Sequence, residues 1–288
     1  FGDTHIHTHL SLDASMQATR STPSQSYAFA KGSPLAPNGP GGSTFQLERP
    51  LDFAIVTDHA EFFGEVEICN NPKQKGYHSK TCTQYREQPG RAFVKMNFPL
   101  SRLSFWNSLP RRHSFCGKKG ILCRKAAIIP WKKIQKAAQQ AYEKCSFTSF
   151  IGYEWSGSPL ARSIHRNVVF IGSNLPKRPT SYFEAPKPTQ LWDKLDKECK
   201  QQEDCDVLTI PHNSNLSGGR MFLPFRKKDK LLVYARKRAA FESLIEIFQH
   251  KGDSECGPTS ADELCGFEKL RYNNLAGNRF GGIFSGKP

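Results

Sequence analysis

Short apolar segments that end or begin in histidine, aspartate or glutamate are the feature of this sequence that most constrains its fold. Leu51–Val56 runs into Thr57-Asp58-His59, and Asp206–Pro211 runs into His212-Asn213. Nearly unbroken apolar runs of this length are typical of strands buried in parallel sheets. Residues of these polar types are costly to bury without a partner, so their repetition at strand ends indicates one shared polar site.

The predicted strands alternate with predicted helices along the chain. In order, the strands are the opening segment around His5 and His7, Leu51–Val56, Phe147–Gly152 followed by Tyr153-Glu154-Trp155, His165–Gly172, Asp206–Pro211 and Leu244–Phe248. Helices are predicted from Pro23 to Lys31 after the cap Thr22, from Pro130 to Cys145, after a cap at Thr189, and over Leu231–Ala240. This alternation predicts a mainly parallel α/β sheet or barrel, with its ligands at the carboxyl ends of the strands. His165 begins its strand, so it either reaches across the sheet or lies on a strand of opposite direction.

The opening stretch FGDTHIHTHLSLDA has the spacing of a metal site. His5, His7 and His9 recur at every second residue, and in a strand such side chains point to one face. Imidazole suits zinc, iron, manganese and copper, and Asp13 adds the oxygen ligand that a catalytic divalent ion commonly takes. Alone, this pattern is more typical of a solvated edge strand than of a metal site.

Length and composition agree with one large domain. A chain of 288 residues with 38% hydrophobic residues can bury a core of α/β-barrel size, and no apolar run is long enough to span a bilayer. We expect residues 65–129, which are rich in Lys, Pro, Gly and Cys, to form an inserted subdomain or lid. Its histidines, His78 and His113, are expected on the surface. Because the chain opens on Phe1, we expect a processed protein or a fragment.

The net charge of +15 indicates an anionic partner. Lysines and arginines cluster at 111–133 and 226–238. Phosphate esters, nucleic acid and an acidic surface all remain possible partners. Few aromatic residues are interleaved with these clusters, so binding of nucleic acid is not favoured.

Nine cysteines are more than a cytosolic enzyme usually keeps, and none forms the C-x-x-C pair that is typical of a zinc ribbon. They therefore indicate disulfides and an oxidising compartment. They fall into close neighbours: Cys69 with Cys82, Cys116 with Cys123, Cys199 with Cys205, and Cys256 with Cys265. Pairing of nearest neighbours is one of many possible schemes, and it leaves Cys145 over. A periplasmic or secreted protein is expected.

Several blocks of the sequence, in order along nearly the whole chain, resemble a known family. FGDTHIHTHLSLDA and VTDHAEF are similar to the opening motifs of the polymerase and histidinol phosphatase (PHP) superfamily. IGYEW, HRNVVF, IPHNSNLSGGRMF and KGDSE resemble a secreted bacterial branch known chiefly as a domain of unknown function. The resemblance implies a distorted (β/α)7 barrel, similar to a TIM barrel, that holds two or three divalent ions, most often zinc, manganese or iron.

The resemblance also implies which residues bind these ions. They are His5, His7, Asp13, His59, Glu154, His165 and His212, with Glu154 at the place of the bridging carboxylate. His9 is not part of the superfamily pattern. The superfamily closes its site with an Asp-x-His pair on the last strand, and no such pair occurs in this sequence after Asp3-Thr4-His5, so the barrel is expected to lack its last strand. His250 with Asp253 is a possible substitute.

Adjacent divalent ions suit hydrolysis of a phosphoester, because they neutralise phosphoryl oxygens and lower the pKa of a bound water. Polar residues near the metal ligands are expected to orient a ligand, move a proton or contact phosphate. These are Asp58, Arg166, Asn213, Arg220 and Lys251, with Asn167 and Asn215 as further candidates.

The expected function is therefore that of a metal-dependent phosphoesterase acting on a phosphorylated small molecule or a phosphodiester. A metal-dependent amide or ester hydrolase is an alternative from a related class of enzyme. A truncated, non-catalytic module that binds anionic polymers is an alternative of another kind, and its binding would weaken steeply with salt.

Overall fold

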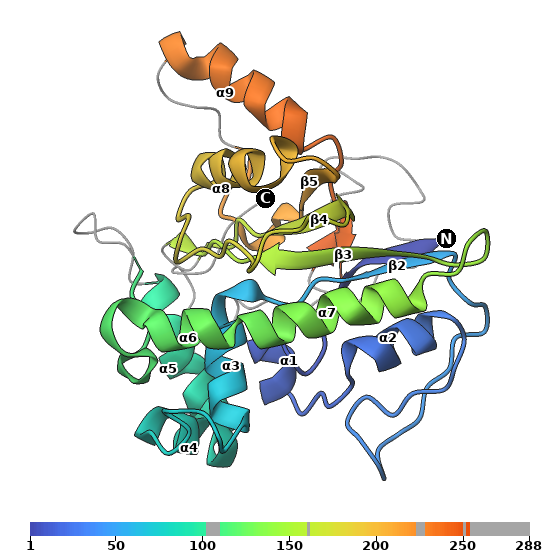
Figure 1. The fold of residues 1–288 in the computed structure, drawn as a ribbon, viewed down its shortest axis with the longest axis vertical. Helices are drawn as coiled ribbons and strands as arrows, with labels where there is room; N and C mark the ends of the chain where they lie inside the picture. The colour runs from blue at the N-terminus through green and yellow to red at the C-terminus, as the bar shows by residue number, and fades with distance from the viewer. Residues whose placement is uncertain (102–109, 160–161, 223–227, 250–251, 254–288) are drawn as a thin grey trace, which may run out of the picture.

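The computed structural model describes residues 1–101, 110–159, 162–222, 228–249 and 252–253. Its centre is a sheet of five strands in the order β1-β2-β3-β4-β5 (Figure 1). The strands are β1 (Gly2–Ile6), β2 (Phe53–Val56), β3 (Thr148–Trp155), β4 (Arg166–Gly172) and β5 (Cys205–Pro211). β1, β2 and β3 are parallel, and β4 is antiparallel to both of its neighbours. A separate hairpin pairs β6 (Phe248–Gln249) with β7 (Gly252–Asp253).

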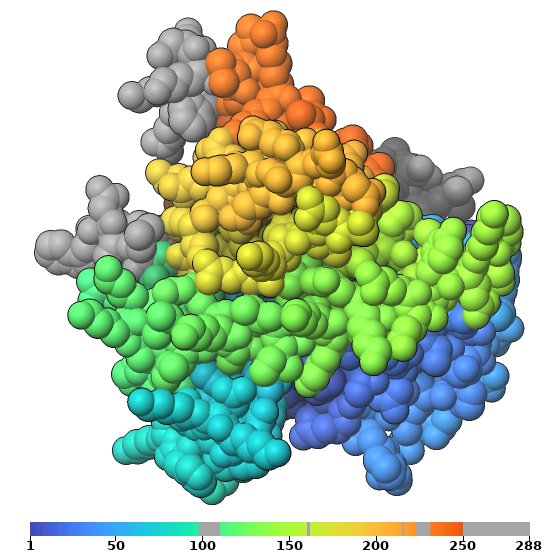
Figure 2. Space-filling model, viewed as in Figure 1, coloured from blue at the N-terminus to red at the C-terminus, as the bar shows by residue number. Residues whose placement is uncertain are grey.

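Helices precede and follow these strands. They are α1 (Leu12–Met16), α2 (Pro23–Ala30), α3 (Phe63–Asn70), α4 (Lys80–Glu87), α5 (Pro89–Ser101), α6 (Ile121–Ala126), α7 (Ile128–Ala141), α8 (Pro188–Leu195) and α9 (Lys228–Phe241). Short 3-10 turns occur at Ala60–Phe62, Ser114–Cys116, Lys118–Gly120 and Ser214–Leu216, and one π-helical turn at Asp196–Lys200 extends α8. Figure 1 shows α2 and α7 along β2 and β3, and α8 near β4 and β5, while α9 projects from the body in Figure 2.

The two faces of the sheet belong to different hydrophobic clusters. Tyr153, Val168 and Val207 belong to the large core shared with the helices. Trp131 of α7 packs against Tyr153 with ring centroids 5.8 Å apart. The opposite face carries a small cluster of Ile55, Val169 and Ile210, with Phe150 and Leu208 packed against it. Among the described residues, the helices therefore bury one face of the sheet.

The sheet is strongly curved. The Asn167 side chain on β4 donates a hydrogen bond of 3.0 Å to the Thr4 carbonyl oxygen on β1, although β2 and β3 lie between these strands. Neighbouring strands lie about 4.8 Å apart, so a flat sheet would separate β1 and β4 by about 14 Å. The segment around Glu246 connects the two edge strands, β1 and β5. The Glu246 N–H donates to the Pro211 carbonyl on β5, and the Glu246 carboxylate contacts His5 on β1.

Local sequence explains where the helices begin. Thr22 forms a capping box with Gln25, and Pro23 fits the first turn of α2. The helix predicted from Pro130 to Cys145 spans Ile128–Ala141, and Trp131, Ile134 and Ala138 are buried on its core-facing side. Its predicted end is wrong, because the helix stops before Tyr142 and Cys145, which are both exposed. The helix near residue 190 begins one residue before the predicted cap, because Pro188 occupies the first turn of α8.

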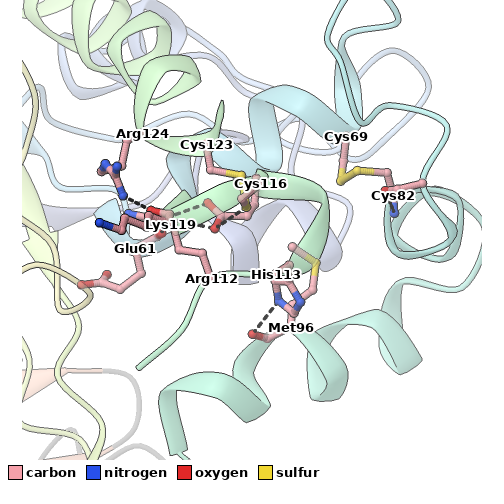
Figure 3. Close-up of a disulfide and its surroundings, with 12 residues drawn as sticks. Glu61, Cys69, Cys82, Met96, Arg112, His113, Cys116, Lys119, Cys123 and Arg124 are labelled. Carbon is pink, nitrogen blue, oxygen red and sulfur yellow. Dashed lines mark hydrogen bonds and ion pairs between the residues drawn. A yellow bond between two sulfur atoms is a disulfide. The ribbon is translucent and has the colours of Figure 1, made fainter. Parts of the chain in front are cut away.

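Within residues 65–129, the described parts, 65–101 and 110–129, contain several short helices and two disulfides (Figure 3). Arg112 ties this segment to the rest of the chain: its guanidinium donates to both oxygens of Glu65 at 2.9 and 3.0 Å and to Glu184 Oε1 at 3.1 Å. His113 is half-buried and contacts the Met96 carbonyl, which corrects its expected place on the surface, whereas His78 is exposed. A lid function of the segment stays a prediction.

Three of the four predicted disulfides are present: Cys69–Cys82, Cys116–Cys123 and Cys199–Cys205. Cys145 is free and exposed, as the pairing scheme requires. The fourth pair, Cys256 with Cys265, lies outside the described residues. Within the described part of the chain, no helix has the length and apolar character needed to cross a membrane.

The α/β class is confirmed, but the described strands form an open sheet of mixed direction and not a closed barrel. The prediction of a strand over Leu244–Phe248 is wrong. Residues 244–247 are not in a strand, and only Phe248–Gln249 pairs, in the small hairpin. Alternation of Leu, Glu, Ile and Phe in LIEIF has strand character, yet one side chain of this run, Glu246, is instead used in contacts beyond the sheet.

Candidate metal centre

One edge of the sheet brings the predicted ligands together. The carboxyl ends of β1, β2, β3 and β5 meet at this edge, because these strands run in one direction. β4 runs the opposite way, so its amino end, where His165 stands, lies at the same edge. The second of the two alternatives for His165, a strand of opposite direction, is therefore the one observed.

Glu154, which is only 1% exposed, lies at the centre of the cluster. Its Oε2 is 2.9 Å from His7 Nε2, 3.0 Å from His59 Nδ1 and 3.4 Å from His5 Nε2. Its Oε1 is 2.8 Å from His165 Nδ1 and 3.9 Å from His212 Nε2. Five imidazoles from four segments thus surround one carboxylate.

Asp13 supplies a second carboxylate at the rim of the cluster. Its Oδ2 is 3.2 Å from His7 Nδ1 and 3.4 Å from His59 Nε2. Asp13 is positioned by its place in the first turn of α1, where its Oδ1 accepts hydrogen bonds from the Ser11 hydroxyl and the Ala14 N–H. His7 and His59, with ring centroids 4.5 Å apart, therefore lie between the two carboxylates.

Other groups contact the outer nitrogens of His5, His165 and His212, and one contacts the His59 nitrogen that also faces Glu154. Glu246 Oε1 is 2.7 Å from His5 Nδ1, and Ser158 Oγ is 2.8 Å from His165 Nε2. Ser156 Oγ is 2.5 Å from His59 Nδ1, and the Asn213 carbonyl oxygen is 2.7 Å from His212 Nδ1. Such contacts fix the orientation of an imidazole and the nitrogen it presents to a ligand.

The cluster favours positive charge beside its carboxylates. Burial raises the pKa of Glu154, but His59, His165 and His5 outweigh it and hold the pKa well below its usual value. For Asp13, burial is likewise outweighed by His59 and His7, and its pKa is well below normal. Burial lowers the pKa of His5, but the charge of Glu154 and hydrogen bonds to Glu154 and Glu246 raise it to about 9.

The donor set fits divalent metal ions. Three overlapping groups each place one ligand atom per residue within 4.8 Å of the others: His5, His7 and Glu154; His7, Asp13 and His59; His59, Glu154 and His165. Mixed imidazole and carboxylate donors are typical of zinc, manganese and iron sites. Glu65 also lies close to Cys116 and Cys123, but those sulfurs form a disulfide and do not offer thiolates.

The residues expected to contact substrate are more scattered. Asp58 is fully buried, and its two oxygens accept from the Thr8 N–H at 2.5 Å and the Thr8 hydroxyl at 2.8 Å. Arg166 is 1% exposed and donates to Glu242 and to the Ile164 carbonyl. Both residues are therefore committed to contacts within the protein, and neither is placed to meet a ligand from solvent.

Of the other candidates, Asn213 contacts Glu246, Arg220 is exposed and Lys251 lies outside the described residues. Asn213 is buried, and its N–H donates to Glu246 Oε2 at 2.8 Å. Arg220 is exposed in the turn after β5. Lys251 lies outside the described residues, as does His250, the expected partner of Asp253.

His9, the third histidine of the opening stretch, is turned away from the cluster. Its Nδ1 is 3.0 Å from the Ser21 carbonyl oxygen. The residue lines a separate surface pocket of about 290 Å³ beside Glu67, Asn70 and Lys133. Asn167 points to Thr4 as described above, and the side chain of Asn215 lies outside the described part.

Sequence reasoning missed Glu246, Ser156 and Ser158. Glu246 interrupts the apolar run LIEIF, and a charged residue within such a run was the available signal. Ser156 and Ser158 lie two and four residues after Glu154, but serine after a strand is so common in loops that the sequence offers no comparable signal.

Comparison with known proteins gives one match. No curated protein and no solved structure matches this chain. The model of one protein family, described as "Protein of unknown function (DUF3604)", matches residues 1–280. This match covers nearly the whole chain and agrees with the predicted resemblance to a family of unknown function. The chain belongs to the DUF3604 family.

Proposed function

We propose that this protein is a metal-dependent hydrolase of phosphoesters. One observation carries the proposal: five imidazoles and two carboxylates, drawn from segments between residues 5 and 212, converge at a single edge of the sheet. Packing alone gives no reason for so many titratable groups to face one another, because each is costly to desolvate.

Each residue of the cluster has a definite part in this proposal. His5, His7, His59, His165 and His212 supply neutral nitrogen ligands, while Asp13 and Glu154 supply charged oxygen ligands. Bound divalent ions would supply Lewis acidity, which activates water and stabilises a phosphoryl group during in-line displacement. Ser156, Ser158 and the Asn213 carbonyl keep the imidazoles oriented.

The protein's charge supports an anionic substrate. A net charge of +15 raises the local concentration of phosphate esters and other anions around the molecule. An exposed guanidinium such as Arg220, in the turn that follows His212, is available for bidentate contact with phosphate. The buried Arg166 is not part of this proposal.

We further propose membership of the PHP superfamily, with the described sheet as one wall of a distorted barrel. The hydrogen bond from Asn167 to Thr4 supports this, because it crosses two strands on the concave side. Helices packed on one face and a small apolar cluster with the ligand cluster on the other are also typical of barrel walls. Three disulfides support a periplasmic or secreted location.

The test uses the full chain, stripped with chelator and reloaded separately with Zn²⁺, Mn²⁺ or Fe²⁺. Bound metal is measured by elemental analysis, and turnover is measured with an aryl phosphate, a bis-aryl phosphate, an aryl acetate and an aryl amide. We expect tightly bound metal and hydrolysis of at least one phosphate substrate. His5→Ala should lower this activity by about a hundredfold or more, because a direct ligand is lost.

His78→Ala is the matched control, since His78 is exposed and lies outside the cluster. It should retain the metal content and activity of the parent. Hydrolysis of the acetate or amide alone would favour the ester or amide hydrolase. A chain that binds no metal and cleaves none of the four substrates would contradict the proposal, and salt-sensitive binding of polyanions would then favour the non-catalytic module.

A further inference from the structure

Glu246 stands out among the residues around the cluster because it comes from a segment outside the five-stranded sheet. It follows α9 by only a few residues and lies between β5 and β6 in the chain. Its carboxylate is 13% exposed.

Both carboxylate oxygens of Glu246 are engaged. Oε1 is 2.7 Å from His5 Nδ1. Oε2 accepts from the Asn213 N–H at 2.8 Å and from the Gln249 side-chain amide at 3.0 Å. The Glu246 N–H donates to the Pro211 carbonyl at 3.0 Å, so main chain and side chain together fix the carboxylate.

The two ring nitrogens of His5 face two different carboxylates. Nδ1 faces Glu246, and Nε2 faces Glu154 at 3.4 Å. A carboxylate that accepts the N–H of an imidazole fixes its tautomer, leaves the other nitrogen as the ligand and makes that nitrogen more basic. His7 and His59 also contact a second carboxylate, Asp13, but Asp13 is itself a candidate ligand, whereas Glu246 belongs to none of the three ligand groups.

We propose that Glu246 is the positioning residue of the metal centre: it holds the Nδ1–H of His5 and thereby directs Nε2 toward the ion. This inference rests on the proposed metal-dependent function and extends it. The same carboxylate accepts the Asn213 N–H, next to His212, so one residue aligns ligands delivered by β1 and by β5. These are the two edge strands of the sheet, and in the described part of the chain no backbone pairing joins them directly.

The test measures Co²⁺ binding to the full chain, with the metal alone as the probe. Glu246→Ala removes the acceptor and should weaken Co²⁺ binding by about 10- to 100-fold, the usual effect of losing such a partner. Glu246→Gln keeps an oxygen that accepts from Nδ1–H and should recover most of this loss. Glu203→Gln is the matched control, because Glu203 is exposed near the opposite end of β5.

A spectroscopic readout separates positioning from simple stabilisation. In the Co²⁺-loaded parent, the exchangeable Nδ1–H of His5 should give a paramagnetically shifted proton resonance that persists in water. Glu246→Ala should lose this resonance and alter the visible ligand-field bands, while Glu246→Gln and Glu203→Gln should retain it. Thermal melts of the metal-free variants show whether folding has changed.

The failures of the two proposals are distinguishable. If the parent binds Co²⁺ but Glu246→Ala binds it with the same affinity and the same spectrum, Glu246 is not a positioning residue. The proposed metal-dependent function is not contradicted by that result. An equal loss in Glu246→Gln and Glu246→Ala, with a matching loss of thermal stability, would also overturn the positioning role. If the parent itself binds no Co²⁺, both proposals fall.

Discussion

Replacing Glu154 by glutamine removes one charge from the centre of the cluster and nearly nothing else. Glutamine has the size of glutamate and retains one oxygen, so the side chain still fits a site that is 1% exposed. Four imidazole nitrogens lie within 3.4 Å of the two Glu154 oxygens, so the change affects every ligand that faces it closely.

The size of the effect follows from the arrangement of the ligands. A zinc ion held by four protein ligands binds with about 10–16 kcal/mol, which is about 3 kcal/mol for each ligand. A loss of about 3 kcal/mol weakens binding by roughly a hundredfold. Glu154 belongs to two of the three ligand groups, so both of these should weaken by about this factor. The group of His7, Asp13 and His59 lacks Glu154 and should be spared.

The assay is a titration of the metal-free chain with Zn²⁺ in competition with a chromophoric chelator. Asp13→Asn is the complementary variant, because Asp13 belongs only to the group that Glu154→Gln spares. We expect the two variants to weaken different steps of the isotherm. Unchanged Zn²⁺ affinity in Glu154→Gln, with the variant folded by circular dichroism, would refute the idea that this carboxylate is a ligand.

Three further predictions concern the stability of the fold. Arg112→Ala leaves the fully buried Glu65 carboxylate without its partner, which should lower the free energy of unfolding by about 3–5 kcal/mol. The melting temperature of the full chain should then fall by roughly 10 °C, and a change of less than about 3 °C would contradict this. Gly64→Ala places a Cβ 1.9 Å from a backbone oxygen in α6 and should cost about 3 kcal/mol or more in chemical denaturation, whereas Gly90→Ala, with open space around it, should be neutral. Joint replacement of Cys69 and Cys82 by alanine opens a loop of 13 residues and should lower the free energy of unfolding by about 3 kcal/mol, and an unchanged denaturation midpoint would argue against this disulfide in solution.

The ligand types at strand ends were readable from sequence because they depend on local pattern. Leu51–Val56 and Asp206–Pro211 are apolar runs with no competing helical period, and they became β2 and β5 with small shifts of their ends. Capping at Thr22 and the stripe on α7 also depend on neighbours in the chain. The disulfides joined near neighbours, for which chain closure is entropically easy.

Contacts between distant segments were not readable in this way. Arg166 has the charge and the position expected of a phosphate ligand, but burial on β4 pairs it with Glu242. Asp58 stands next to His59 in sequence, yet both its oxygens are used by Thr8. Glu246 belongs to a segment whose predicted strand is absent, and its contact with His5 spans 241 residues.

The sequence by itself determined the residue types of the site and most of the elements that carry them, since periodicity and capping act over a few residues. Only the tertiary structure decided which of these polar groups meet. The direction of β4, which places His165 at the common edge, and the curvature that brings Asn167 to Thr4 both result from packing between strands far apart in the chain. Burial and pairing of charges depend on that packing, and no local pattern encodes it.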